Sequence, residues 1–443
     1  MQEAKVRQLA RLLGNGPGNG AGSELVVENY TASHLAEQFS TPYFVYSGKV
    51  ILRQIRRVSQ ALGPETELFF SLKANPSLGI CQLMAGQGVG AEVASIGELL
   101  LAQKAGFPAD RTIFAGPGKT GEELELANKL AVLAVNVESQ GELARLAEIS
   151  QQTGRATGVG VRVNLARQVK GAQMRMGGGP QQFGVDEEQV GSLLREFMEY
   201  PYVRILGPHV YSGTQMFDAE AVAAHCHSVV DLALTMADAL GRPLEMVDFG
   251  GGFGVPYFEN SPEFDLDRFG QLYQQVVARC KSDRRLAPAR LIVELGRYLV
   301  AEAGVYVTRV VDVKESRGRT FVVTDGGMNH HIMATGNFGQ VFRKPYPVAL
   351  LNRLEAPAQD QVTLVGPCCT PLDVFAQNLP FPRVDVGDLV GIFYSGAYGY
   401  SASSLAFLSH PTPAEILVWR GKAHQLREPG RPEAVLDGQR GLQ

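Results

Sequence analysis

The chain has 443 residues, of which 45% are hydrophobic and 19% charged, and its formal net charge is -4. This length suggests two or three domains with ample material for buried cores. The near-neutral balance argues against a nucleic-acid-binding protein, which normally carries a basic patch. Five cysteines in a chain of this length do not indicate the framework of a disulfide-rich domain.

The N-terminal segment, residues 1–24, is predicted to be flexible. Met1–Gly22 mixes charged and apolar residues and lacks the uninterrupted apolar core of a secretory signal. Gly14–Ser23 has the composition of a flexible linker. No stretch of the chain approaches the roughly 18 apolar residues that a membrane span requires. We therefore expect a cytoplasmic protein with no membrane segment.

Eight short apolar runs, separated by stretches of helical character, occupy the first two thirds of the chain. They are Leu68–Leu72, Gly90–Ala94, Thr112–Ala115, Val132–Val137, Gly158–Val163, Ile205–Val210, Met246–Phe249 and Leu291–Glu294. Their spacing leaves room for the crossover helices that parallel strands require. Eight alternations of strand and helix predict a (β/α)₈ barrel over residues 48–297. A doubly wound open sheet is the alternative that fits the same pattern.

After Arg297 the pattern changes to strands with turn signals and little helix. These strands are expected at Gly304–Val313, Thr320–Thr324, Gln361–Val365, Asp388–Tyr394 and Glu415–Trp419. They predict an all-β domain over residues 298–420, followed by a fraying tail over 421–443. Residues 25–47 add a helix at Thr31–Phe39 and a strand at Pro42–Tyr46. This segment could join either domain, and we assign it to the β-domain.

Catalytic groups of a barrel enzyme lie at the carboxyl ends of the strands, and polar residues occur there in this sequence. Lys73 follows the first strand, where a charged amine is costly to bury and is suited to Schiff-base formation. Alternatively, its side chain simply reaches solvent. Glu92 ends the second strand. Glu294 and Arg297 at the eighth could hold a protonated ring nitrogen and a phosphate, or form only a structural ion pair.

Three consecutive glycines follow the seventh strand, at Gly250, Gly251 and Gly252. They allow backbone N–H groups to approach an anion, although a tight turn uses the same residues. The sixth strand leads to Tyr211, whose ring could stack on a planar ligand or pack in the core, and to the hydroxyl of Thr214.

No metal site is expected. Cys368 and Cys369 are adjacent and lack the second ligand pair of a zinc site. His225 and His227 lie two residues apart in a predicted helix, so their side chains face different directions.

Together these motifs resemble the fold-type III pyridoxal-phosphate decarboxylases, the family of the diaminopimelate, ornithine and arginine decarboxylases. The resemblance extends from about Thr41 to Pro413. The motifs that carry it are, in order, Ser-Leu-Lys-Ala-Asn, Glu-Val-Ala-Ser-Ile-Gly-Glu-Leu, the triple glycine, Glu-x-Gly-Arg, Cys-x₃-Asp and Gly-Ala-Tyr. The resemblance implies an alanine racemase-like (β/α)₈ TIM barrel with a second, all-β C-terminal domain. It also implies pyridoxal 5′-phosphate as cofactor and decarboxylation as the reaction.

The resemblance implies a role for each matching residue. Lys73 would hold the cofactor, and Glu294 would keep its pyridine nitrogen protonated, which favours decarboxylation over racemisation. The further cofactor contacts would be Glu92, Tyr211, Thr214, Gly250, Gly251, Gly252, Gly296, Arg297 and Tyr398. Tyr211 stands where the family has a ring-stacking histidine. Cys369 would complete the active site of the partner subunit in a homodimer and protonate the product carbon.

Departures from the family pattern concern the substrate. Thr370 follows Cys369, where diaminopimelate and ornithine decarboxylases have an acidic residue that binds a distal amino group. The Arg-Pro pair that follows Asp-x-Gly-Met-Asn in diaminopimelate decarboxylases is missing, and the motif here runs into His330 and His331. We expect these three residues to face the substrate. Because no acidic partner is available, a distal positive charge would be costly to bury.

Further motifs resemble the glutamyl-[acyl-carrier-protein] decarboxylases of butirosin-type biosynthesis. They include Gly-x-His-Val-Tyr-x-Gly-Thr-Gln, Cys-Thr-Pro and His-Pro-Thr-Pro. This resemblance predicts an aminoacyl substrate tethered to an acyl carrier protein, in secondary-metabolite biosynthesis. One alternative is a decarboxylase of meso-diaminopimelate or another free basic amino acid. Another is a non-catalytic decarboxylase-like regulator, against which the retention of Lys73, Glu294 and Cys369 argues.

Overall fold

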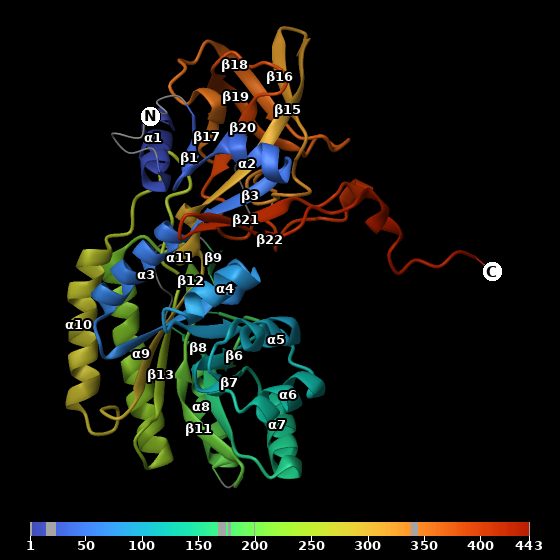
Figure 1. The fold of residues 1–443 in the computed structure, drawn as a ribbon. Coiled ribbons are helices and arrows are strands. Elements are labelled where there is room, and N and C mark those ends of the chain that lie inside the picture. Colours follow the sequence, from blue (N-terminus) through green and yellow to red (C-terminus); the bar gives the residue numbers. More distant parts are fainter. Residues whose placement is uncertain are drawn as a thin grey trace. The chain divides into compact units, whose positions relative to one another are not determined.

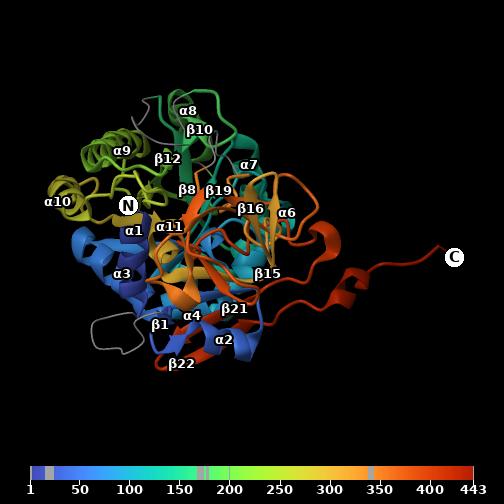
Figure 2. The ribbon, with the colours of Figure 1, turned by 90° about the horizontal axis from the view of Figure 1, so that it is seen from above.

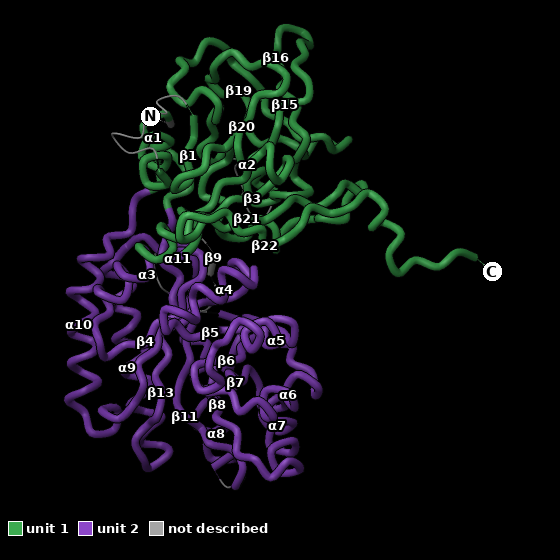
Figure 3. The backbone as a smooth tube through the Cα atoms, viewed as in Figure 1, with its two compact units in different colours: residues 1–53, 256–261, 300–443 green, residues 54–255, 262–299 purple. Residues whose placement is uncertain are grey.

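The chain divides into two compact units (Figure 3). The computed structural model describes residues 2–14, 24–166, 174–175, 179–198, 200–337 and 344–442. Unit 1 contains residues 1–53, 256–261 and 300–443, and unit 2 contains residues 54–255 and 262–299. The short segment 256–261 thus groups with unit 1, although it lies inside the range predicted for the barrel.

Unit 2 is a closed barrel of eight parallel strands (Figure 1). In pairing order the strands are β8 (Thr157–Asn164), β11 (Val203–His209), β13 (Met246–Gly251), β14 (Arg290–Leu295), β4 (Thr66–Ser71), β5 (Gly90–Val93), β6 (Thr112–Phe114) and β7 (Ala134–Val137). Pairing of β7 with β8 closes the ring, which excludes the open doubly wound sheet. The predicted barrel and its eight strands are confirmed. A two-residue strand, β10 (Val185–Asp186), pairs with β8 outside the ring.

Helices connect the strands and cover the outside of the barrel. They are α3 (Gly48–Leu62), α4 (Leu78–Ala85), α5 (Ile96–Ala105), α6 (Gly121–Leu130), α7 (Gln140–Thr153), α8 (Glu187–Phe197), α9 (Ala219–Leu240) and α10 (Leu266–Ser282). Figures 1 and 2 show α9 between α8 and α10. Local sequence sets where these helices start. At α6, for example, Thr120 and Glu123 form a reciprocal capping box. Within the described residues, no helix combines the length and the apolar character needed to cross a membrane.

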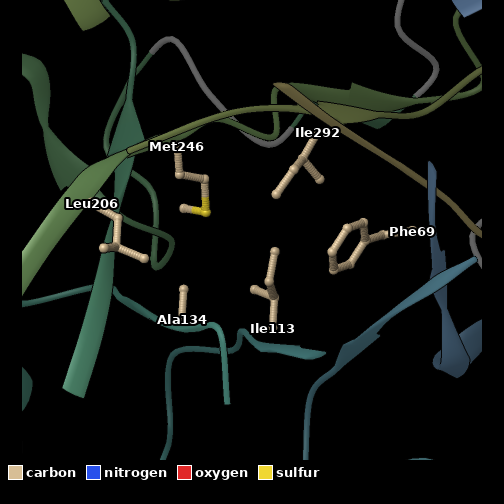
Figure 4. Packing of buried hydrophobic residues seen from close by; sticks show 6 residues of the cluster. All are labelled: Phe69, Ile113, Ala134, Leu206, Met246 and Ile292. Atoms are coloured by element: carbon tan, nitrogen blue, oxygen red, sulfur yellow. The ribbon is translucent and has the colours of Figure 1, made fainter. Parts of the chain in front are cut away.

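An apolar layer fills the middle of the barrel (Figure 4). Its side chains point inward from six different strands and are Phe69, Ile113, Ala134, Leu206, Met246 and Ile292. Side chains on a strand alternate between its two faces, so the residue two positions later points inward again. On β4, β7, β13 and β14 these next positions are Ser71, Asn136, Asp248 and Glu294. A polar layer therefore lies above the apolar one, toward the carboxyl ends of the strands.

Unit 1 is built on a mixed β-sheet. Its strand order is β19 (Val374–Phe381), β18 (Asp360–Val365), β16 (Arg319–Thr324), β15 (Gly304–Ser316), β3 (Tyr43–Ser47), β21 (Ala414–Trp419) and β22 (Lys422–Arg427). β20 (Leu389–Phe393) also pairs with β15, and β17 (Val348–Leu350) pairs with β20. Because β3 pairs with both β15 and β21, the strand that precedes the barrel in sequence lies in the β-domain.

The ends of the chain are more ordered than the sequence suggests. Residues Gln2–Leu13 form helix α1, because Val6, Leu9, Ala10 and Leu13 recur at helical spacing and bury one face. In the predicted tail, β22 forms by main-chain pairing with β21, although four of its six side chains are polar or charged. The described parts of residues 24–40 add β1 (Val26–Val27), β2 (Tyr30–Thr31) and α2 (Ala32–Phe39).

Within residues 298–420, two strands do not appear in the sequence-based prediction, β17 and β19. β19 contains Asn378 and Pro380, which normally argue against a strand. It is the edge strand of the sheet, where a proline is tolerated because one side of the strand has no neighbour to bond.

Candidate active site

Lys73 and Glu92 form an ion pair at the carboxyl end of the barrel. Lys73 lies in the 3₁₀ turn η1 (Leu72–Ala74) that follows β4, and its Nζ lies 3.1 and 3.0 Å from the two carboxylate oxygens of Glu92. Glu92 is buried, whereas 44% of the Lys73 side chain is exposed. The Nζ also lies 5.7 Å from the centre of the Tyr211 ring. Lys73, Glu92 and Tyr211, all predicted as site residues, therefore lie together, and a ligand can reach the lysine amine.

Three titratable side chains meet in the polar layer of the barrel. His209, Asp248 and Glu294 come from the adjacent strands β11, β13 and β14, and their ligand atoms lie within 4.8 Å of one another. His209 Nε2 lies 3.3 Å from Glu294 Oε2, and both side chains are at most 3% exposed. Glu294 Oε1 and Asp248 Oδ2 are buried oxygens that no donor in the described residues reaches.

Charge in this cluster is divided unevenly between the two acids. Burial opposes ionisation of Glu294, but attraction to His209 and hydrogen bonds from His209 and Asp248 lower its pKa to about 2. Burial, followed by repulsion from Glu294, raises the pKa of Asp248 well above its usual value. Two carboxylates this close cannot easily both ionise. Asp248 therefore favours its protonated form beside an ionised Glu294.

The triple glycine brings main chain close to the mouth of the barrel. Gly250 and Gly252 have φ values of +63° and +94°, which side chains rarely tolerate. A Cβ atom on Gly250 would lie 2.4 Å from the main-chain carbonyl oxygen of Val210, and one on Gly251 would lie 1.8 Å from the main-chain carbonyl oxygen of Glu294. Only glycine fits this turn, and it leaves peptide groups that an anion could approach.

The other predicted barrel residues lie on neighbouring turns. Gly296 follows β14, and a Cβ atom there would lie 2.8 Å from the Ala74 Cβ, so this glycine lets the turn pack against the one that carries Lys73. Arg297 begins the short helix α11 (Arg297–Val300). Thr214 lies in β12 (Gly213–Thr214), which pairs with β9 (Met174–Arg175).

In unit 1, Cys369 and Thr370 lie on a loop that a buried carboxylate holds in shape. Asp373 accepts hydrogen bonds from the main-chain N–H groups of Met328, at 2.7 Å, and of Cys368, at 2.8 Å. Cys369 is exposed, whereas Cys368 is buried with its Sγ 3.4 Å from Asn329 Oδ1. The loop thus presents one cysteine and anchors the other. Tyr398, also in unit 1, has a φ of +54°.

Sequence reasoning missed a second charged network, at the ends of β7 and β8. Lys119 Nζ lies 2.6 Å from Glu142 Oε1, and Arg162 Nη1 lies 2.8 Å from Glu138 Oε1. All four side chains are at most 9% exposed. Glu138 also accepts the Gly184 N–H, so the network holds the main chain at Gly184, just before β10. The signal in the sequence was a charged residue directly after β7, Glu138, and another within β8, Arg162.

His225 has a partner in the turn that follows β11. Its Nε2 lies 3.2 Å from the Oγ of Ser212, next to Tyr211 in sequence. Burial lowers the pKa of His225 to about 4, so the ring is neutral and can exchange a hydrogen bond with this hydroxyl.

The comparisons with known proteins agree with the geometry of the barrel. A family model described as the pyridoxal binding domain of pyridoxal-dependent decarboxylases matches residues 49–301. The chain belongs to the pyridoxal-dependent decarboxylases. The decarboxylase is 36% identical over 405 residues to L-glutamyl-[BtrI acyl-carrier protein] decarboxylase of Niallia circulans, covering 91% of this chain and 94% of that one. It is 32% identical to diaminopimelate decarboxylase of Zymomonas mobilis, over 91% and 94% of the two chains.

Solved structures extend this similarity to both units. Diaminopimelate decarboxylase from M. jannaschii, in complex with L-lysine, superposes with a TM-score of 0.87 at 27% identity, over 95% of this chain and 96% of that one. The protein is therefore a pyridoxal-phosphate-dependent carboxy-lyase with a barrel and a β-domain. Its substrate is an amino acid or an aminoacyl group.

The residues at the mouth of the barrel fit the cofactor. Glu294 Oε1, buried and without a hydrogen-bond donor in the described residues, can accept the N–H of a protonated pyridine. The glycine turn offers peptide groups to a phosphate, and Lys73 offers an accessible amine. His209, Asp248 and Glu294 could also ligate a cation, but in a pyridoxal-phosphate enzyme a carboxylate kept ionised suits the ring nitrogen.

Replacing Asp248 tests whether this residue carries a proton. Asp248→Asn keeps an oxygen to accept the Gly250 N–H, at 2.9 Å in the structure, and gains an amide that can donate to Glu294. We expect kcat within about fivefold of wild type, because the hydrogen bonds are preserved. The kcat of Asp248→Ala should be about tenfold lower than that of Asp248→Asn, because the Gly250 N–H and the Glu294 carboxylate both lose their partner. Steady-state kinetics with both variants measures this; an asparagine variant as impaired as the alanine variant would show that Asp248 is ionised.

The structure corrects the expectation that His330 and His331 face the substrate. His330 Nδ1 bonds the Tyr306 hydroxyl at 3.1 Å, and its Nε2 bonds the Pro411 oxygen at 2.9 Å. His331 Nε2 bonds Ser395 Oγ at 2.9 Å. Both rings are at most 1% exposed, and burial lowers their pKa values to about 4 and about 3. They are neutral core residues of unit 1, because aromatic neighbours surround them on the β-sheet.

These buried histidines predict that acid destabilises the protein. Because burial lowers the pKa of His331 to about 3, the unfolded chain, with a histidine pKa of about 6.5, binds more protons between these values. Stability therefore falls as the pH drops through this window, by up to about 1.4 kcal/mol per pH unit for such a group. In His331→Gln, thermal unfolding followed by circular dichroism should show a shallower fall of Tm between pH values of about 6.5 and 4. An unchanged slope would contradict the assignment.

Proposed function

We propose that this enzyme decarboxylates an aminoacyl group that an acyl carrier protein carries as a thioester. The observation that carries the proposal is the loop after Cys369. Thr370 is uncharged, and the carboxylate of Asp373 is occupied by two main-chain N–H groups. A distal ammonium group would therefore find no available acid on this loop, whereas a carboxyl masked as a thioester needs none. The similarity to L-glutamyl-[BtrI acyl-carrier protein] decarboxylase supports the same substrate class.

The barrel residues divide into those that hold the cofactor and those that tune it. Pyridoxal phosphate supplies an electron sink for the electron pair left when CO₂ departs. Lys73 holds the cofactor, and Glu294 keeps its ring nitrogen protonated, supported by His209 and Asp248. Tyr211 offers its ring face. The phosphate contacts are assigned to Gly250, Gly251, Gly252, Gly296, Thr214, Arg297 and Tyr398.

Glu92 has a distinct part in this proposal. Its carboxylate lies within 3.1 Å of the Lys73 amine, so it holds that amine in place and stabilises its charged form when the amine is not engaged. Because Glu92 is buried and Lys73 is half exposed, the lysine rather than the glutamate can move toward a ligand.

Cys369 is the proposed proton donor to the carbon that loses CO₂. It is exposed on a loop that Asp373 holds in shape, which suits a group that must meet a substrate outside its own domain. We infer that the enzyme is a homodimer in which this loop completes the active site of the partner's barrel. The exposed Leu372 on the same loop, with 44% of its surface accessible, supports such a contact.

The two adjacent cysteines provide a matched test of this role. Cys369→Ala should lower kcat by about 10²-fold, the usual contribution of a positioned acid, and leave cofactor absorption unchanged. Cys368→Ala should keep kcat near wild type and lower Tm, because this thiol is buried and burial raises its pKa to about 12. Steady-state kinetics and thermal melts separate the two. Equal kcat values in wild type and Cys369→Ala would remove Cys369 from the mechanism.

The substrate class is tested with purified holoenzyme. The panel contains a γ-glutamyl thioester of a carrier protein's pantetheine arm and the free amino acids meso-diaminopimelate, lysine, ornithine and glutamate, with CO₂ release as the readout. We expect turnover of the thioester alone. Rapid turnover of meso-diaminopimelate, the substrate named for several relatives, would replace this proposal with a free amino acid decarboxylase. Absence of a cofactor absorption band and of any turnover would indicate a non-catalytic relative.

A further inference from the structure

A cavity of about 340 Å³ lies in unit 1 beside the loop that carries Cys369. This volume falls within the range of about 300–1,000 Å³ that small-molecule sites occupy. Its floor is one face of the sheet formed by β16, β18 and β19, including Phe321, Thr363 and Val365, and one wall is the loop residue Thr370. All of these residues belong to unit 1, and none of them is among the residues assigned to the cofactor.

The cavity is elongated along the strands. Strands β16 and β18 are parallel, with Phe321 opposite Thr363 and Val323 opposite Val365. Arg319 begins β16 and therefore lies at one end, whereas the loop with Thr370 follows the carboxyl end of β18 at the other. Five residues of strand separate these ends, or about 16 Å at ~3.3 Å per residue. The cavity thus connects the Cys369 loop with the hairpin between β15 and β16.

The lining changes in character from one end to the other. Near the loop the one acidic residue of the lining is Asp373, whose carboxylate already accepts two main-chain N–H groups. The edge strand β19 adds the amides of Gln377 and Asn378. At the far end is Arg319, and Lys314 lies opposite Phe321 across the hairpin. Among the described residues, no carboxylate lies within ion-pair distance of either cation.

This sequence of groups matches the chemistry of a pantetheine arm. The arm starts at a phosphate, continues through a dimethyl-substituted carbon and two amides, and ends at the thioester. Cations bind the phosphate, Phe321 packs against the methyl groups, and Gln377 and Asn378 pair with the amides. Val365, at the loop end of the floor, lies beside the carbons next to the thioester. We propose that this cavity binds the phosphopantetheine arm of the carrier-tethered substrate and directs its thioester toward the Cys369 loop. This inference rests on the proposed function.

The phosphate contact is tested with two inhibitors and with one substitution that removes a positive charge. 4′-Phosphopantetheine should inhibit decarboxylation of the γ-glutamyl phosphopantetheine thioester about tenfold more strongly than pantetheine, which lacks the phosphate. In Arg319→Ala this preference should fall at least about threefold, because the phosphate loses one of its two charged partners. Arg383→Ala is the matched control. It removes the same charge from an exposed arginine outside the cavity, and the preference should persist.

The course of the arm is tested by filling the cavity. Thr363→Trp places a bulky ring on its floor. The variant should lower kcat/KM for the γ-glutamyl phosphopantetheine thioester at least about tenfold relative to kcat/KM for the γ-glutamyl N-acetylcysteamine thioester. The second substrate is the reference because it lacks most of the arm. Analytical ultracentrifugation of the same variant reports whether the cavity instead belongs to a subunit contact. An unchanged ratio, or a loss of assembly without a change in the ratio, overturns the inference.

The outcomes distinguish this inference from the function on which it rests. If wild-type enzyme turns over both thioesters and neither variant changes the preference, the arm binds elsewhere and the proposed function stands. If wild-type enzyme turns over neither thioester but does turn over a free amino acid, the proposed function itself is wrong, and the arm site with it.

Discussion

Lys73→Ala should lower kcat by at least about 10³-fold and abolish the absorption band near ~420 nm that a pyridoxal cofactor shows when joined to a lysine. Lys73 is the amine at the mouth of the barrel that pairs with Glu92 and faces Tyr211. Removing it takes away the covalent attachment, whereas the glycine turn and Arg297 remain. The variant should therefore still bind pyridoxal phosphate, but reversibly and more weakly. Absorption spectra before and after dialysis, together with kcat, measure both effects.

Lys104→Ala is the control for this experiment. Lys104 lies near the end of α5, is exposed, and forms no part of the proposed site. Its replacement removes the same charge and should leave the spectrum and kcat unchanged. The fold of Lys73→Ala should persist, because the lysine side chain is 44% exposed at the mouth of the barrel, and a thermal melt verifies this. A Lys73→Ala enzyme that keeps the absorption band and full activity would refute the assignment.

The barrel could be predicted from the sequence because each of its strands and helices is specified by a short, continuous segment. Each strand is a short apolar run, such as Met246–Phe249, and each is followed by a segment with helical caps and periodicity. Eight repeats of that unit leave few folds to choose from. The barrel also dictates that residues at the carboxyl ends of its strands share one opening, which is why Lys73, Glu92 and Tyr211 could be expected to meet.

His209 was not predicted as a site residue because its inward orientation depends on pairing between strands. Asp248 was also missed, although alternation from Met246 alone places it inside the barrel. Along β11, Leu206 points into the barrel, so simple alternation would turn His209 outward. A register shift between Ile205 and Gly207 changes the parity and returns His209 to the interior. Such a bulge is set by the neighbouring strands and leaves little trace in sequence.

The error at His330 and His331 has a similar origin. The residues stand next to a motif that resembles substrate-binding sequence, and proximity in sequence suggested proximity to the substrate. In the fold, both rings are buried and bond to partners more than twenty residues away. Polar residues that pair inside a core cannot be distinguished from site residues without the tertiary contacts that satisfy them.

Glu294→Gln should lower kcat by about 10²–10³-fold, the usual cost of removing a group that stabilises charge in the transition state. Attraction to His209 overcomes burial and lowers the pKa of Glu294 to about 2, so the wild-type side chain is a carboxylate at every pH at which the enzyme is assayed. A neutral amide cannot hold the ring nitrogen protonated, and the electron sink weakens. The attachment through Lys73 does not depend on this contact. The variant should therefore keep its cofactor absorption band while losing turnover, the opposite of the spectral result for Lys73→Ala.

Glu188→Gln, an exposed position on α8, makes the same change away from the barrel mouth and should have no effect on kcat or on the spectrum. The pH profile adds a readout that a structural role would not produce. Because Glu294 stays ionised, wild-type kcat should show no loss from its protonation above a pH of about 3, and Glu294→Gln should lower the profile uniformly rather than shift it. Wild-type turnover in Glu294→Gln would mean that the ring nitrogen needs no anionic partner. In that case the cluster of His209, Asp248 and Glu294 would be a structural feature of the barrel rather than part of its chemistry.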